Sequence, residues 1–368
     1  MPIELKNVRI LDLSRVLAGP LCSMILGDLG ADVIKVERPG QGDESRGWGP
    51  PFDADGESAY YLSCNRNKLS VALDLDNSGD RAVLATLMQD ADVVLENFRD
   101  GALSSRGIHS REWLDRNPGL IWCTISGFGP DSDRPGYDFV VQAESGWMSI
   151  TGEPDGDPMK AGVALADVIA GKDAAIAILG ALLGRDRSPT PLAAENRLLH
   201  ISLRGSAMAS LINVAQNTLV SGRDPQRWGN AHPNLVPYQL FNARDGQLVI
   251  AVGNDMQWKA ACVTLGLESL GSDASLATNA GRLAQRDRVV STITERLTMA
   301  DMSHWLGALE RAGVPCGVVR SVREALEGYP ASPVTGVAPS VPGTVRLRPP
   351  KLNEHGEEIR RKGWSAFG

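Results

Sequence analysis

The sequence lacks an excess of basic residues. Its 368 residues include 37 Lys and Arg against 44 Asp and Glu, which gives a net charge of -7 at neutral pH. Nucleic-acid-binding proteins usually carry a basic footprint, so the composition argues against that class. A small anionic ligand needs only a few local cations and stays open as a substrate.

Cysteine is scarce, and long apolar runs are missing. The five cysteines are scattered and never spaced as CxxC, which favours free thiols in a reducing compartment over disulfides or zinc. The first residues, MPIELKNVRI, hold charges and no signal-peptide core. No apolar run approaches the roughly 18 residues of a membrane span. These features predict a cytoplasmic enzyme with no membrane partner.

Common catalytic and cofactor signatures are missing as well. No GxGxxG follows the first expected strand, which argues against a nicotinamide dehydrogenase, and the Walker A, HExxH and GxSxG patterns do not occur. The histidines show no metal-ligand spacing, so we expect no metal. The chemistry is then left to carboxylates, backbone donors and local cations.

Strand and helix patterns alternate through the first third of the chain. Strand-like segments at 8–13, 31–37, 69–75, 92–98 and 120–129 are separated by helix patterns at 20–29, 77–91 and 109–118. Successive βα units predict an α/β fold with a doubly wound parallel sheet. Ligands of such sheets bind beyond the carboxyl ends of the strands.

The pattern changes after residue 205. A hairpin pattern at 238–254 precedes helices from 255 to about 310, which predicts a smaller α/β domain at 225–325. Residues 206–224 are expected to form a linker. The tail, 326–368, is too short to fold alone, so we expect it to complete a large domain with residues 1–205.

Asp167 stands out within AGVALADVIAGKDAAIAILGALLG, residues 161–184, because its neighbours offer no counter-charge. Taken alone, a structural role is favoured, since aspartate is a preferred N-cap and a buried helix pattern follows. The two roles are compatible. A partly desolvated carboxylate at a helix N-terminus could also attack an activated carbonyl.

Several segments together resemble the family III coenzyme A transferases. They include LDLSRVLAGP and VERPGQGDESR near the N-terminus, ADVVLENFRDGAL, ISGFGPDSDRPGYDF, GVALADVIAG, GNAHPNLVPYQLF and PPKLNEHGEEI. The resemblance covers nearly the whole chain. It implies a Rossmann-like large domain built from both chain ends, a small α/β domain, and a homodimer of two interlocked rings.

The resemblance also implies the chemistry. The family nucleophile is an aspartate in the segment that matches GVALADVIAG, and it falls on Asp167. Its carboxylate attacks an acyl-CoA thioester to give a mixed anhydride, and CoA then returns to form an aspartyl-CoA thioester. An acceptor acid repeats these steps in reverse. Coenzyme A is therefore a substrate, and no tightly bound cofactor is expected.

Further residues match family positions. Those expected to contact CoA are Val16, Arg38, Leu73, Asn97, Phe98 and Arg106, of which Arg106 is displaced by one position from the family arginine. Those expected around the acyl group are Arg15, Leu17, Tyr60, Tyr137, Asp138, Gly253, Asn254 and Asp255. Leu17 replaces the glutamine of the formyl-CoA enzyme, which argues against exchange between oxalate and formate.

Arg15 and Arg46 lie in segments that could reach the acyl pocket. With the similarity to dicarboxylate members of the family, these cations suggest a succinyl-CoA-like donor and a dicarboxylate acceptor. An α-methylacyl-CoA racemase is the nearest alternative on the same fold. It needs a histidine where Tyr137 stands, and a tyrosine with an ordinary pKa near ~10 is a poor base. A non-catalytic CoA-binding protein is a further alternative.

Overall fold

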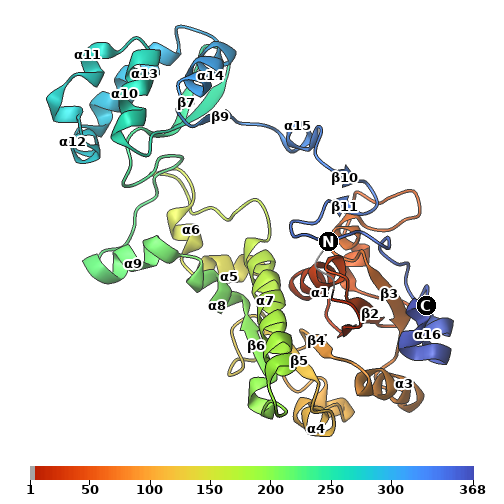
Figure 1. The fold of residues 1–368 in the computed structure, drawn as a ribbon. Helices are drawn as coiled ribbons and strands as arrows, with labels where there is room; N and C mark the ends of the chain where they lie inside the picture. Colours follow the sequence, from red (N-terminus) through yellow and green to blue (C-terminus); the bar gives the residue numbers. More distant parts are fainter. Residues whose placement is uncertain (1–4) are drawn as a thin grey trace. The chain divides into compact units, whose positions relative to one another are not determined.

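The computed structural model describes residues 5–368, and these form two compact units (Figure 1). The first unit contains the described residues up to Met148, together with Lys160–Asp224 and Tyr329–Gly368. The second contains Ser149–Met159 and Pro225–Gly328. Most of 206–224, which we expected to be a linker, lies in helices α8 (Leu203–Ala209) and α9 (Ile212–Ser221) of the first unit. Helix α8 buries Leu203, Ser206 and Ala207, which explains why it belongs to this core.

A six-stranded parallel sheet forms the centre of the first unit, in the order β3-β2-β1-β4-β5-β6. The strands are β1 (Arg9–Asp12), β2 (Asp32–Glu37), β3 (Lys68–Ala72), β4 (Val93–Glu96), β5 (Ile121–Ser126) and β6 (Leu198–Ser202). The order reverses between β1 and β4, and the crevice at such a reversal is where open α/β sheets bind ligands. The predicted α/β class and parallel sheet are confirmed.

Helices cover both faces of this sheet. Alternate residues of β1 point to opposite faces, so Ile10 belongs to one apolar core and Leu11 to the other. The helices on the Ile10 side are α1 (Ala18–Asp28), α5 (Asp138–Glu144), α7 (Leu165–Arg187) and α8, and those on the Leu11 side are α3 (Ser78–Gln89), α4 (Ser110–Arg116) and α16 (Gly356–Lys362). Short elements complete the unit: α2 (Ala59–Leu62), α6 (Trp147–Ile150, shared with the second unit), β10 (Ala331–Ser332), β11 (Gly336–Val337), and 3-10 turns at Glu44–Gly47, Ser104–Arg106, Ala194–Asn196 and Gly363–Phe367.

Helix α7 packs directly against α1 through small side chains. Ala166, Ala170 and Ala174 are fully buried along this line. A Cβ atom on Gly171 would lie 2.5 Å from the carbonyl oxygen of Ala18, in the first turn of α1. Residues four apart share a helix face, so this close approach brings Asp167 toward the N-terminal end of α1.

We expect Gly171→Ala to lower the free energy of unfolding by about 1–3 kcal/mol, because the added methyl group meets backbone that cannot rotate away. Urea denaturation would measure the loss. Gly180→Ala is the matched control on the same helix, since a Cβ there meets nothing within 4 Å. Alanine is more favourable than glycine in a helix interior by up to ~1 kcal/mol. The free energy of unfolding of the control should therefore be unchanged or higher. Equal stability of the two variants would contradict the close packing.

The C-terminal segment belongs to the first unit. Helix α16 lies beside β3 (Figure 1), and the indole of Trp364 donates to the carbonyl oxygen of Leu87 at 3.0 Å. The carbonyl oxygen of Pro350 accepts from the hydroxyl of Tyr61 at 3.1 Å. The sheet core is therefore completed by residues from both ends of the described chain.

The second unit is smaller and contains an antiparallel sheet in the order β7-β8-β9. Its elements are β7 (Tyr238–Asn242), β8 (Gln247–Ala251), α10 (Asp255–Thr264), α11 (Glu268–Gly271), a 3-10 turn at Ala274–Leu276, α12 (Asn279–Ala284), α13 (Arg286–Leu297), α14 (Met302–Arg311), β9 (Cys316–Val318) and α15 (Val322–Leu326). The expected hairpin is present, with Asn242 paired to Gln247 across its turn. Trp258, Trp305 and Leu248 are among the buried residues of its core.

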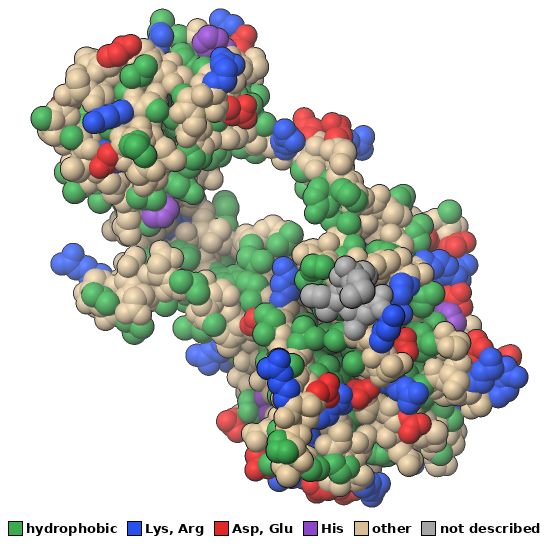
Figure 2. Space-filling model, viewed as in Figure 1, with side chains coloured by type: hydrophobic (Ala, Val, Ile, Leu, Met, Phe, Trp, Pro, Cys, Tyr) green, Lys and Arg blue, Asp and Glu red, His purple; other side chains and the backbone are tan. Residues whose placement is uncertain are grey.

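Charged side chains of both signs are spread over the face shown in Figure 2, in keeping with a net charge of only -7. Within residues 5–368, no helix has the length and apolar character needed to cross a membrane.

Candidate active site

A cleft of about 480 Å³ opens in the first unit at the carboxyl ends of the central strands. Seven predicted site residues line it: Arg15, Val16, Leu17, Asn97, Phe98, Tyr137 and Asp167. They come from the loops after β1, β4 and β5 and from the first turn of α7. The parallel sheet thus gathers residues as distant in the sequence as Arg15 and Asp167.

A second cleft lies at the ends of β1, β2 and β3 and shares Arg15 and Phe98 with the first, so the two adjoin. It collects the other residues expected to contact CoA, namely Arg38, Leu73 and Arg106. Arg106 forms an ion pair with Asp76 at 2.8 Å, and Asp76 lines the same cleft. Arg106 therefore lines this cleft although it is displaced by one position from the family arginine.

Asp167 is not the N-cap of its helix. Helix α7 begins at Leu165, with Ala164 as N-cap, so Asp167 is the third helical residue. The capping role belongs to Asp138 of α5, whose Oδ1 accepts from the amides of Ala166 at 2.8 Å and Asp167 at 3.4 Å. Because Asp138 supplies the cap from another helix, the carboxylate of Asp167 is free of that structural duty.

Burial, and secondarily the charge of Asp138, raises the pKa of Asp167 to about 7. Within residues 5–368, neither a cation nor a hydrogen-bond donor contacts its carboxylate, while the helix N-terminus favours the anion. Burial also raises the pKa of Tyr60 to about 12, with Asp167 as the next contribution. Tyr60 therefore stays protonated beside a carboxylate that can ionise near neutral pH.

Several expected site residues have structural partners. Asn254 caps α10, since its Oδ1 accepts from the amide of Gln257 at 2.9 Å, and Asp255 pairs with Arg282 at 2.8 Å. With Gly253, whose amide donates to Gln257 Oε1, they belong to the second unit. Their role at the acyl group stays a prediction.

Arg46 does not offer an unpaired cation. It binds Glu37 at 2.8 Å and Glu57 at 2.7 Å, and its guanidinium carbon lies 3.6 Å from the ring centroid of Tyr61. Burial opposes its charge, but Glu37, Tyr61 and Glu57 together outweigh burial and raise the pKa of Arg46. A guanidinium with two carboxylate partners is poorly placed to bind a substrate carboxylate. Of the two candidate cations, only Arg15 lines the cleft of Asp167.

Sequence reasoning missed a group of buried charges under the cleft. Asp12, Lys35, Asp43 and Lys68 have side chains that are fully shielded from solvent and are joined in ion pairs. Burial opposes the charge of Asp12, yet Lys68 and Lys35 lower its pKa to about 2. Asp12 and Lys35 interrupt otherwise apolar strands, and this pattern could have revealed them.

Glu96 at the end of β4 is another buried acid of the cleft. It accepts from the hydroxyl of Thr124 at 2.5 Å and from the amide of Phe98 at 2.8 Å, and burial raises its pKa. Glu96 therefore fixes the loop that carries Asn97 and Phe98. In the described part of the chain, no group of three or more His, Cys, Asp and Glu residues is placed to hold a metal ion.

Comparison with known proteins gives one consistent result. The model of CoA-transferase family III matches residues 5–332. The chain is 41% identical to the succinate–glutarate CoA-transferase of Agrobacterium fabrum, over 96% of this chain and 94% of that protein. It is 42% identical to the succinyl-CoA:glutarate CoA-transferase of Mus musculus, over 87% of this chain and 73% of that protein. The crystal structure of a CAIB/BAIF family protein from Brucella suis superposes with a TM-score of 0.84 and 38% identity, covering 98% of this chain and all of the other.

Proposed function

Because this chain belongs to CoA-transferase family III and is a CoA-transferase, we propose that it moves CoA from succinyl-CoA to a dicarboxylic acid such as glutarate through a covalent intermediate on Asp167. The observation that carries the proposal is a half-buried carboxyl with a raised pKa, in a cleft where none of the cations in residues 5–368 contacts it. The names of the relatives support the choice of acids.

The proposed steps need no outside base. The Asp167 carboxylate attacks the thioester carbonyl of succinyl-CoA, and the C–S bond breaks to give a succinyl–aspartyl anhydride and CoA thiolate. The thiolate attacks the aspartyl carbonyl, which releases succinate and leaves an aspartyl-CoA thioester. The acceptor carboxylate attacks that thioester, and the C–S bond breaks to give an acceptor–aspartyl anhydride and CoA thiolate. The thiolate then attacks the acceptor carbonyl of this anhydride, which forms the acceptor acyl-CoA and frees the Asp167 carboxylate. A desolvated carboxylate of high pKa suits this work, since it is more nucleophilic than a solvated one.

Arg15 is the proposed ligand of the distal carboxylate. Its guanidinium lies 5.0 Å from the ring centroid of Phe98 and 2.5 Å from the carboxylate of Glu44. The ion pair with Glu44 is exposed to solvent and therefore weak. A substrate carboxylate can replace Glu44 there. We propose that CoA occupies the two adjoining clefts, with Arg38 and Arg106 near its phosphates.

An interlocked homodimer is part of the same proposal. Helix α9 buries none of its residues, and Ile212, Leu219 and Val220 are 71%, 78% and 77% exposed. Apolar surface of this kind is typical of protein–protein interfaces, and a second copy of the chain would cover it. Sedimentation should show a dimer that does not dissociate on dilution. A monomer at micromolar concentration would contradict this part.

Trapping tests the covalent step. The enzyme is incubated with succinyl-CoA alone, treated with hydroxylamine, and digested for mass spectrometry. We expect a hydroxamate on Asp167 and release of succinate before any acceptor is added. A panel of acids then tests the substrate, and much higher kcat/KM for monocarboxylates would exclude the dicarboxylate assignment. Exchange of the α-proton in heavy water without CoA transfer would favour the racemase alternative.

The pH dependence follows from the raised pKa of Asp167. The free enzyme needs the ionised carboxylate, so kcat/KM for succinyl-CoA should rise with pH, by about tenfold per pH unit well below pH 7, and level off above it. Initial rates over pH 5–9 with the donor limiting measure this. A profile that is flat between pH 5 and 7 would contradict the assignment.

A further inference from the structure

The loop after β1 holds an uncommon backbone conformation at the cleft. Val16 has φ of +72°, in the left-handed region. A β-branched residue is seldom found there, because the conformation is strained for any residue with a branched Cβ. Val16 and Leu17 line the same cleft as Asp167. The surrounding structure must therefore stabilise this backbone.

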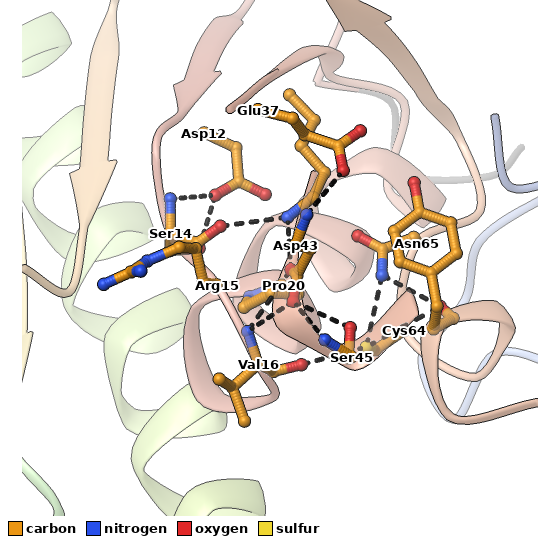
Figure 3. Close-up of polar contacts among 12 residues, drawn as sticks. Asp12, Ser14, Arg15, Val16, Pro20, Glu37, Asp43, Ser45, Cys64 and Asn65 are labelled. Carbon is orange, nitrogen blue, oxygen red and sulfur yellow. Dashed lines mark hydrogen bonds and ion pairs between the residues drawn. The ribbon is translucent and has the colours of Figure 1, made fainter. Parts of the chain in front are cut away.

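Asp43 and Lys35 supply the stabilising contacts. The amide of Val16 donates to Asp43 Oδ1 at 3.1 Å, a contact drawn in Figure 3. Asp43 Oδ2 receives Lys35 Nζ at 2.9 Å, and the same ammonium group donates to the carbonyl oxygen of Ser14 at 2.9 Å. Both side chains are fully buried. One ion pair thus binds the loop on either side of Arg15.

Other side chains take the remaining backbone groups of Ser14, Arg15 and Val16. Asn97 binds both the amide and the carbonyl oxygen of Arg15, at 2.9 and 2.7 Å. Asp12 accepts from the amide of Ser14 at 2.9 Å, and Cys64 Sγ donates to the carbonyl oxygen of Val16 at 3.7 Å. Every backbone donor and acceptor of these three residues therefore has a side-chain partner.

The ion pair keeps both groups charged in a buried setting. Burial opposes the charge of each group, but Lys35 lowers the pKa of Asp43, while Asp43 and Asp12 raise the pKa of Lys35. A charged acceptor binds the Val16 amide more strongly than a neutral one. Neither residue lines the cleft that contains Asp167, although Asp43 lines the adjoining cleft that we propose for CoA.

We propose that Asp43 and Lys35 are positioning residues that hold Val16 in the left-handed conformation and so fix the Val16–Leu17 segment relative to Asp167 in the cleft. A misplacement of about 1 Å in a reacting pair costs on the order of 100-fold in rate. The effect on catalysis rests on the proposed function, whereas the effect on the backbone does not.

A double-mutant cycle separates positioning from general support. Glycine adopts a positive φ without strain, so the Val16→Gly background needs Asp43 less. We expect Asp43→Ala to lower kcat about 30-fold or more in the Val16 background and less than about 5-fold in the Val16→Gly background. The loss should fall on kcat more than on KM for succinyl-CoA. Lys35→Met should follow the same pattern and serves if Asp43→Ala does not fold.

Asp28→Asn is the matched control. Asp28 is a buried partner of Arg66 at 2.7 Å and does not line either cleft. It should lower stability while changing kcat less than about threefold in both backgrounds. An equal loss of kcat for Asp43→Ala in the two backgrounds would overturn the proposal.

Urea denaturation of the same variants gives a readout that requires no activity. Asp43→Ala should raise the unfolding equilibrium constant in both backgrounds. The rise should be about 10-fold smaller in the Val16→Gly protein than in the wild type. If the wild type transfers no CoA but this coupling is present, the proposed function fails and the backbone role stands. If transfer is present and both couplings are absent, the positioning role fails.

Discussion

Replacing Asp167 with asparagine should lower kcat for CoA transfer on the order of 10⁴-fold or more. The amide cannot form the anhydride or the thioester, so the covalent route is lost rather than slowed. The cleft keeps its shape, because the helix is capped by Asp138 and does not depend on the side chain of Asp167. KM for the donor should therefore change by much less than kcat. Transfer is measured by following glutaryl-CoA formation by liquid chromatography.

Asp173→Asn is the matched control on the same helix. Asp173 accepts from the hydroxyl of Ser206 at 2.6 Å and lines neither cleft. Its loss should cost less than tenfold in kcat. Asp167→Ala guards against slow hydrolysis of the asparagine amide, which would restore aspartate. Residual activity above about 1% in Asp167→Ala would rule out Asp167 as the nucleophile.

Asp167→Asn should also stabilise the folded protein above neutral pH. The unfolded chain holds Asp167 at an ordinary pKa of 3.8, and the folded chain raises it to about 7. The folded state therefore binds more protons between these values, and its stability falls as pH rises through that window. Above pH 7 the ionised carboxylate costs up to about 4 kcal/mol, at about 1.4 kcal/mol per pH unit between the two pKa values. Asparagine removes this cost.

Denaturation at pH 8 and pH 4, at one protein concentration, measures the difference between Asp167→Asn and the wild type. The variant should be the more stable at pH 8, and the gain should be nearly absent at pH 4. Asp80→Asn gives the opposite sign. Asp80 is also the third residue of its helix, but a hydrogen bond from Arg360 lowers its pKa. That variant should lose stability at pH 8, and the loss should disappear only as the pH falls below the lowered pKa of Asp80. No gain at pH 8 for Asp167→Asn would contradict the raised pKa.

Much of the fold could be predicted because its signals are local. The amide donors at the start of α3 are capped by Asn77, the first residue of the helix pattern at 77–91 and a residue type preferred at N-caps. At α4 the helix begins at Ser110, with His109 as N-cap and no side-chain cap. The start of α7 could not be found in this way, because its cap, Asp138, lies 29 residues from Asp167 along the chain. A contact between distant segments leaves no spacing rule in the sequence.

The resemblance predicted many of the residues that line the cleft of Asp167. It did not predict the buried residues that support the loops of the cleft. The charge of Arg46 and its place in the sequence suggest a substrate contact, yet Glu37 and Glu57 bind its guanidinium. Asp43 lies only three residues before Arg46 and was not singled out. The left-handed backbone of Val16 was also unpredictable, since it depends on the position of Asp43 in space.

The return of the C-terminal segment to the sheet has a consequence during synthesis. Ile359 and Trp364 belong to the same core as Leu87, but they are made roughly 160 residues after β6. At a typical 5–20 residues per second, that delay is on the order of 10–30 s. During this time the core on the α3 side of the sheet lacks Ile359 and Trp364. The growing chain then presents an apolar surface that chaperones can bind. The second unit consists of Ser149–Met159 and Pro225–Gly328, so it can fold before the first unit is complete.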